Sequence, residues 1–208
     1  MKIALAQLNY TIGDISANKD KIIANIERAK REKADVVLFA EQAISGTPAF
    51  DLLRKTTFLE LCDDALAEIA SHCKGLTAIV GVPTLGENGT QSAAAIIERG
   101  RVVRYITKAN ITARREMGFL SGGKGAETIK IAGEKVCVVV SDICVIANES
   151  EVNCDIIVVE VAGNIFNKHA VSHLSHLVEV SGEADDLVVY IEIQSLLDSR
   201  VSHCNCLI

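Results

Sequence analysis

The chain has 208 residues, 49% of them apolar, which suits one domain with a sizeable aliphatic core. A formal net charge of -6 and the lack of a dense basic run argue against a general nucleic-acid-binding protein. No apolar run approaches the length that spans a bilayer, so we expect no membrane segment. The seven cysteines are odd in number and scattered, which indicates reduced core thiols in a cytoplasmic protein.

The first part of the chain alternates strand-like and helix-like segments. The expected strands cover residues 2–8, 35–40 and 77–82, and the expected helices run to about residue 33 and over residues 58–73. Ser16 or Asn18 is expected to cap the first helix, and Pro83 to close the third strand.

Turns become frequent in the second part of the chain. An Asn-Gly hairpin turn is expected at residues 86–89, and a glycine-rich loop at residues 118–125. A single helix is expected over residues 166–180. This order predicts a mixed α/β fold. The remaining expected strands cover residues 92–98, 101–107, 128–132, 135–140, 154–161 and 187–193.

A carboxylate directly follows the most apolar strand. Residues 36–39 are all apolar, and Glu41 comes after one further small residue. A charge at the end of a buried strand is costly unless it is paired or used, and strand ends in layered folds often carry functional side chains. Glu41 is therefore a candidate site residue. The alternative is that Glu41 only marks the exit of the strand into solvent.

Several motifs follow one another in a characteristic order. They are Lys2-Ile3-Ala4-Leu5-Ala6-Gln7-Leu8-Asn9, Phe39-Ala40-Glu41, Ser45-Gly46-Thr47-Pro48, Asp51-Leu52-Leu53, Val80-Gly81-Val82-Pro83 and Arg104-Tyr105-Ile106-Thr107-Lys108. This set resembles the nitrilase or carbon-nitrogen hydrolase superfamily, and within it the glutaminase domain of glutamine-dependent NAD synthetases. The resemblance covers mainly the first half of the chain.

The resemblance implies a nitrilase-like four-layer αββα sandwich. It would form one domain over residues 1–208, with the C-terminal part of the second sheet missing or altered. The family hydrolyses amides with a Glu base, a Lys and a Cys nucleophile, and we expect neither a cofactor nor a metal. The thiolate attacks the carbonyl, the carboxylate moves the proton, and the lysine stabilises the oxyanion. By matching position, Glu41 is the base and Lys108 the cation. The alternative for Lys108 is an ordinary surface lysine.

The nucleophile position departs from the family pattern. Aligning Asp142-Ile143 with the Asp-Ile that follows the family cysteine places Val140 there, and a valine cannot attack a carbonyl. Cys137 lies three residues upstream and, in a strand, faces the opposite side. Cys144 lies four residues downstream, about one helical turn away. Cys144 is the candidate displaced nucleophile.

Three further features have weaker parallels. The family carries a second glutamate, whose place falls on Arg115 or, with a slip, on Glu116. Ser121-Gly122-Gly123 is similar to an ATP pyrophosphatase loop but lacks the following Asp-Ser, which favours a plain turn over a phosphate cradle. Three histidines share a face of the predicted helix without a zinc-enzyme motif, which favours surface positions over a metal site: His169, His173 and His176.

Two main function hypotheses remain. The first is hydrolysis of a small-molecule, glutamine-type amide by Glu41 and Lys108, with Cys144 or Cys137 as the nucleophile. The second is a catalytically inactive nitrilase-fold pseudoenzyme that acts as a binding or assembly module. A damaged gene product without a selected function is a third reading. A shortened sheet would leave an exposed edge, so we also expect a homo-oligomer, and we expect no nucleic-acid or membrane partner.

Overall fold

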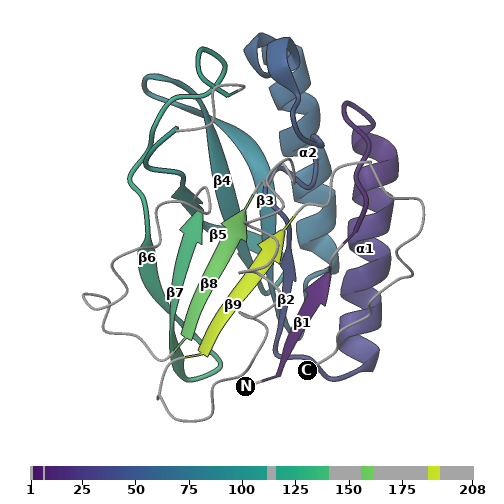
Figure 1. The fold of residues 1–208 in the computed structure, drawn as a ribbon. Helices are drawn as coiled ribbons and strands as arrows, with labels where there is room; N and C mark the ends of the chain where they lie inside the picture. Colours follow the sequence, from purple (N-terminus) through teal and green to yellow (C-terminus); the bar gives the residue numbers. More distant parts are fainter. Residues whose placement is uncertain (1, 7, 112–115, 141–155, 162–186, 193–208) are drawn as a thin grey trace, which may run out of the picture.

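The computed structural model describes residues 2–6, 8–111, 116–140, 156–161 and 187–192 (Figure 1). Within these residues the strand orders of the two sheets are β1-β2-β3-β4-β5 and β6-β7-β8-β9. The elements are β1 (Ile3–Ala6), α1 (Ile15–Arg31), β2 (Val36–Phe39), η1 (Phe50–Arg54), α2 (Thr56–His72), β3 (Thr77–Gly86), β4 (Gly89–Glu98), β5 (Arg101–Thr107), β6 (Glu127–Ile131), β7 (Glu134–Val140), β8 (Ile156–Val161) and β9 (Leu187–Glu192).

The first sheet is parallel at one side and antiparallel at the other. β2 runs parallel to β1 and β3, whereas β4 and β5 continue the sheet as antiparallel neighbours. Helices α1 and α2 lie side by side on one face of this sheet (Figure 1). Their buried apolar residues, such as Ile26 and Leu66, recur at helical spacing and point into the common core.

The second sheet covers the other face of the first (Figure 1). β7 packs on β4 and β5, and Val136, Val138 and Val140 belong to the same core as Ile106. The layers are thus helix, sheet and sheet, as expected for the first three layers of an αββα sandwich. The expected helix over residues 166–180 lies outside the described residues. No helix in the described part of the chain is long and apolar enough to cross a membrane.

The expected cap of the first helix is wrong. Asp14 caps α1, because its carboxylate accepts a hydrogen bond from the backbone N–H of Ala17 at 3.1 Å. Asn18 is fully buried and serves another purpose. Its amide donates to the carbonyls of Thr11 and Ile44 at 2.8 and 3.1 Å, so it ties the loop before α1 to the segment after β2.

Two other expectations need correction. Pro83 does not close the third strand, since β3 continues to Gly86. β2 pairs with β3 only as far as Ile79, so Pro83 has no ladder partner on that side and its missing N–H costs nothing there. The sequence also gave no signal for the short 3₁₀ helix η1. The other expected strands and helices in the described residues are confirmed within a few residues at their ends.

Candidate active site

Glu41 follows β2 and is completely buried, so its alternative role at a solvent exit is wrong. The turn after it is tightly fixed. Gln42 has a left-handed backbone with φ of 53°, a conformation that costs energy for a residue with a side chain. The N–H of Gly13 donates to the carbonyl of Ser45 at 2.8 Å, and that of Gly46 to the carbonyl of Gln42 at 2.8 Å. These contacts hold Glu41 in one place.

Gly81 explains why a glycine interrupts the apolar strand β3. A Cβ atom added at Gly81 would collide with the carbonyl of Ala40 and would lie 2.6 Å from the Cα of Glu41. Only a residue without a side chain lets β3 approach the Glu41 turn this closely. The glycine in the Val80-Gly81-Val82-Pro83 motif is therefore required by packing against the site.

Lys108 follows β5 and is also completely buried, so the surface-lysine alternative is wrong. Its Nζ lies 3.3 Å from Oε1 of Glu41 and 2.9 Å from Oε2 of Glu116. A buried ammonium is tolerated only with such partners. Strands β2 and β5 therefore bring together two of the three predicted site residues, although they are 67 positions apart in the sequence.

Glu116, one of the two positions on which the family's second glutamate could fall, lies against Lys108. It is 3% exposed, and its Oε1 has no hydrogen-bond partner within the described ranges. The loop beyond it is anchored by Arg54, which donates to the carbonyl of Gly118 at 2.6 Å and places its guanidinium 4.8 Å from the Phe119 ring centroid. Such a cation–π contact adds to the hold on the loop.

Ser92, on β4, belongs to the cluster and was missed by the sequence reasoning. Its hydroxyl is fully buried and donates to Oε1 of Glu41 at 2.6 Å. Its carbonyl accepts the backbone N–H of Lys108 at 2.8 Å. The sequence feature that could have identified Ser92 is its hydroxyl side chain directly before the apolar run of β4. A buried hydroxyl at such a position needs a hydrogen-bond partner.

Val140 ends β7 with 2% of its surface exposed and faces the core between the sheets. Cys137 is buried but sits at the alternate position of the strand, as expected from its odd offset. Cys144 lies outside the described residues. Cys62 and Cys73 are buried on and just after α2, where burial raises the pKa of each thiol to about 12, so both are structural thiols.

The glycine-rich loop is not a phosphate cradle. The N–H groups of Gly123 and Gly125 donate to the carbonyls of Lys108 and Thr107 at 2.7 and 2.9 Å, and the N–H of Lys124 donates to Oγ1 of Thr107 at 2.8 Å. Because these donors are already used, they are unavailable to a phosphate. The loop instead packs along the end of β5 and helps to fix Lys108.

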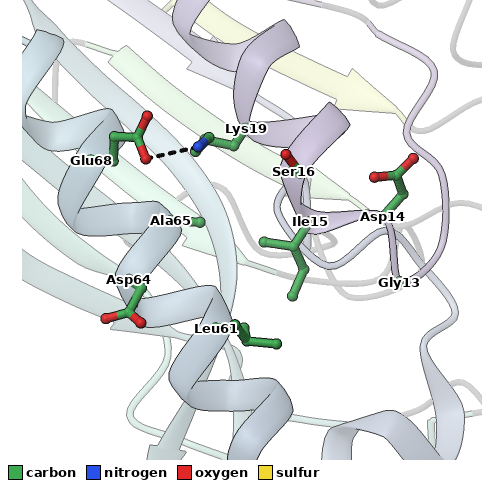
Figure 2. A pocket seen from close by; sticks show the side chains of 9 residues that line it. All are labelled: Gly13, Asp14, Ile15, Ser16, Lys19, Leu61, Asp64, Ala65 and Glu68. Atoms are coloured by element: carbon green, nitrogen blue, oxygen red, sulfur yellow. Dashed lines mark hydrogen bonds and ion pairs between the residues drawn. The ribbon is translucent and has the colours of Figure 1, made fainter.

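A pocket of about 420 Å³ lies elsewhere, between the start of α1 and helix α2 (Figure 2). Ile15 and Leu61 provide apolar lining, and Lys19 bridges to Glu68 at 2.7 Å across its rim. None of the buried cluster lines this pocket. The predicted histidines lie outside the described residues, and the described ranges contain no group of three His, Cys, Asp or Glu side chains suited to a metal.

The buried cluster thus consists of one ammonium between two carboxylates, with a hydroxyl donating to one of them. In a water-poor interior such groups interact strongly. The ammonium can stabilise a carbonyl oxygen or an oxyanion, and a carboxylate can accept a proton. Such an arrangement can provide the charges that amide chemistry requires.

The sequence profile of the carbon-nitrogen hydrolase family matches residues 2–172. The chain belongs to this family. It is 42% identical over 103 residues to the glutamine-dependent NAD(+) synthetase of Xanthomonas campestris, which covers 49% of this chain and 19% of that relative. It is 34% identical over 141 residues to the Aquifex aeolicus synthetase, covering 65% of this chain and 24% of the relative. This chain therefore spans only about a fifth to a quarter of the length of these two relatives.

Solved structures confirm the nitrilase-like fold. The glutamine-dependent NAD+ synthetase of Acinetobacter baumannii superposes with a TM-score of 0.78 and 26% identity over 92% of this chain and 38% of that one. The amidase of Nesterenkonia sp. AN1, a nitrilase-superfamily protein, gives a TM-score of 0.73 over 93% of this chain and 76% of that one. At 20% identity, this second likeness concerns the fold alone. That amidase was trapped with the acetamide moiety of fluoroacetamide on its active-site cysteine.

Proposed function

We propose that residues 1–208 form a single pseudoenzyme domain that binds a glutamine-type amide but does not hydrolyse it by thiol attack. The observation that carries the proposal is the buried, apolar Val140 at the position that matches the family's nucleophile. The family relatives support an amide as the ligand, since those named above are glutamine-dependent synthetases.

The chemistry of the cluster supports amide binding. A carboxamide has one carbonyl acceptor and an NH₂ group with two donors. Lys108 supplies a donor for the carbonyl oxygen, and Oε1 of Glu116 is a buried acceptor without a hydrogen-bond partner among the described residues. Burying such charges costs several kcal/mol per ion, which pairing and a polar ligand would offset. In this proposal Glu41 and Lys108 bind the amide, and they occupy the positions of the family's glutamate and lysine.

Restoring the nucleophile tests the proposal. The wild type should bind glutamine or acetamide in calorimetry but release no ammonia, whereas Val140→Cys should release ammonia from the same amide. The activity should disappear again in Val140→Cys/Glu41→Ala, because the base would be missing. Val139→Cys is the matched control: it adds a thiol at the neighbouring position, on the other face of β7, and should remain inactive.

The second candidate is hydrolysis by a displaced nucleophile, favoured by the intact pairing of Glu41 with Lys108. It requires Cys144 to deliver a thiolate to the amide carbonyl. Ammonia release by the wild type that is lost in both Glu41→Ala and Cys144→Ser would establish it and refute the pseudoenzyme. If the wild type binds no amide in calorimetry, the proposal that the domain binds an amide is refuted.

We also propose that the chain forms a homo-oligomer. Edge strand β5 leaves Val103 and Tyr105 exposed at 45% and 40%, and apolar side chains on an open sheet edge favour association. Sedimentation analysis should give a mass above that of one chain, and Val103→Lys/Tyr105→Lys should lower it. A wild type that sediments as a monomer would contradict this proposal.

A further inference from the structure

We propose that Ser92 is a positioning residue that fixes the Glu41 carboxylate against Lys108 and stabilises its charged form. This role rests on the proposed amide site, in which Glu41 binds the amide or accepts a proton from the nucleophile. It concerns a hydroxyl that the sequence motifs do not identify.

The contact has the geometry of a charge-assisted hydrogen bond. The hydroxyl of Ser92 donates to Oε1 of Glu41 at 2.6 Å, within the range for a hydroxyl on an ionised carboxylate. The same oxygen lies 3.3 Å from Nζ of Lys108. Neither Ser92 nor Glu41 has exposed surface, so the hydrogen bond acts where water does not weaken it.

Two donors on one oxygen also define the orientation of the carboxylate. The hydroxyl of Ser92 and the ammonium of Lys108 both lie at Oε1 of Glu41. Ser92 lies on β4, between β3, which carries Gly81, and β5, which Lys108 follows. Its hydroxyl therefore reaches Glu41 from a second direction. The carboxylate is therefore held from two sides.

Ser92 acts on both charged residues at once. Its side chain contacts Glu41, and its backbone carbonyl accepts the N–H of Lys108 at 2.8 Å. The backbone bond survives any substitution at position 92, so replacing the side chain tests the hydroxyl alone. This separation makes the role of Ser92 measurable.

The chain offers a matched control two positions away on the same strand. Thr90 is also buried, and its hydroxyl donates at 2.7 Å to the carbonyl of Leu53, away from Glu41. Ser92→Ala and Thr90→Ala each remove one buried hydroxyl donor from β4. Both should destabilise the fold to a similar degree, but only Ser92→Ala should change the behaviour of Glu41.

The protonation of Glu41 should be followed by infrared spectroscopy of the whole chain, using the carboxyl band that is missing in Glu41→Gln. In Ser92→Ala the midpoint of this titration should rise by about one to two pH units, because a hydrogen bond to the charged form is lost. Thr90→Ala should keep the wild-type midpoint, and Ser92→Thr, which retains the hydroxyl, should restore it. In the Val140→Cys background, Ser92→Ala should shift the acidic limb of the activity profile upward by the same amount.

An unchanged midpoint in Ser92→Ala, or an equal shift in Thr90→Ala, would overturn the role of Ser92. Ser92→Cys repeats the test if the alanine variant does not fold, since a thiol is a weak donor of similar shape; its midpoint should also rise, and a wild-type midpoint would overturn the proposal. The infrared titration needs no substrate. Failure to bind an amide would therefore refute the proposed function while leaving this result to stand or fall separately.

Discussion

The first sheet brings Glu41, Ser92 and Lys108 into one buried cluster, whereas the second sheet ends β7 on the apolar Val140. In the proposed amide site, the first region would supply the charged groups, and the second would supply the position that the family's nucleophile occupies. The charged residues and Val140 therefore lie on or next to different strands of different sheets. One part can change while the other keeps its geometry.

The physical costs of such changes are unequal. Removing a single charge from the first region would leave its partners buried without compensation, which is strongly destabilising. Placing a valine at the end of β7 adds buried apolar surface and introduces no polar group of its own. The fold therefore constrains the charged residues much more strongly than the nucleophile position.

The largest expected effect comes from Lys108→Met, which keeps the length of the side chain but leaves the carboxylates of Glu41 and Glu116 facing each other. We expect a loss of about 3–5 kcal/mol in the free energy of unfolding, measured in urea. Lys19→Met removes the exposed ion pair with Glu68 and should change this free energy little. Equal effects would mean that the buried cluster is no more constrained than the surface.

A smaller effect is expected from Gly81→Ala, because the new methyl group meets the backbone around Ala40 and Glu41. The cost should be about 1–3 kcal/mol, as for other overpacked sites. Gly133→Ala, in the β6–β7 turn, meets no atom within 4 Å but has a φ of 97°, so it should cost only the strain of a left-handed backbone, about 1 kcal/mol. If Gly133→Ala were less stable than Gly81→Ala, the packing around Glu41 would not be the tighter constraint of the two.

A further effect, confined to alkaline pH and small near pH 9, concerns the buried thiols of the helix layer. Burial raises the pKa of Cys62 and Cys73 to about 12 in the folded chain, from an ordinary value of 9.0. Above about pH 9 the unfolded chain loses these protons while the folded chain keeps them, so the free energy of unfolding should fall as pH rises towards 12. Urea unfolding at neutral and alkaline pH measures the slope, and Cys62→Ala/Cys73→Ala should flatten it. A slope unchanged by these substitutions would show that other groups cause it.

The sequence predicted the first region well because its signals are local. An apolar run that stops at Glu41 and the motif that ends in Lys108 identify two strand ends, and both residues lie in the cluster. Ser92 could not be found this way, because a serine before an apolar run has many uses and its partner is 51 positions away. The sequence left the place of the second glutamate open between Arg115 and Glu116, because a linear motif does not show the contact of Glu116 with Lys108.

Local signals also failed where long-range contacts decide the structure. Asn18 suits a helix cap by residue type, but its buried contacts with Thr11 and Ile44 depend on how two loops meet. Pro83 normally ends a strand, yet β3 continues because one of its edges lacks a partner there. The prediction of Cys144 as a displaced nucleophile stays untested by the described residues.

The fully buried cluster has a consequence for heat tolerance. The hydration of charged groups becomes less favourable as temperature rises, so the penalty for keeping Glu41 and Lys108 out of water shrinks on warming. Replacing the cluster with apolar residues of similar volume would thus gain less near the unfolding temperature than near room temperature. The cluster should therefore destabilise the fold less at high temperature than at low temperature.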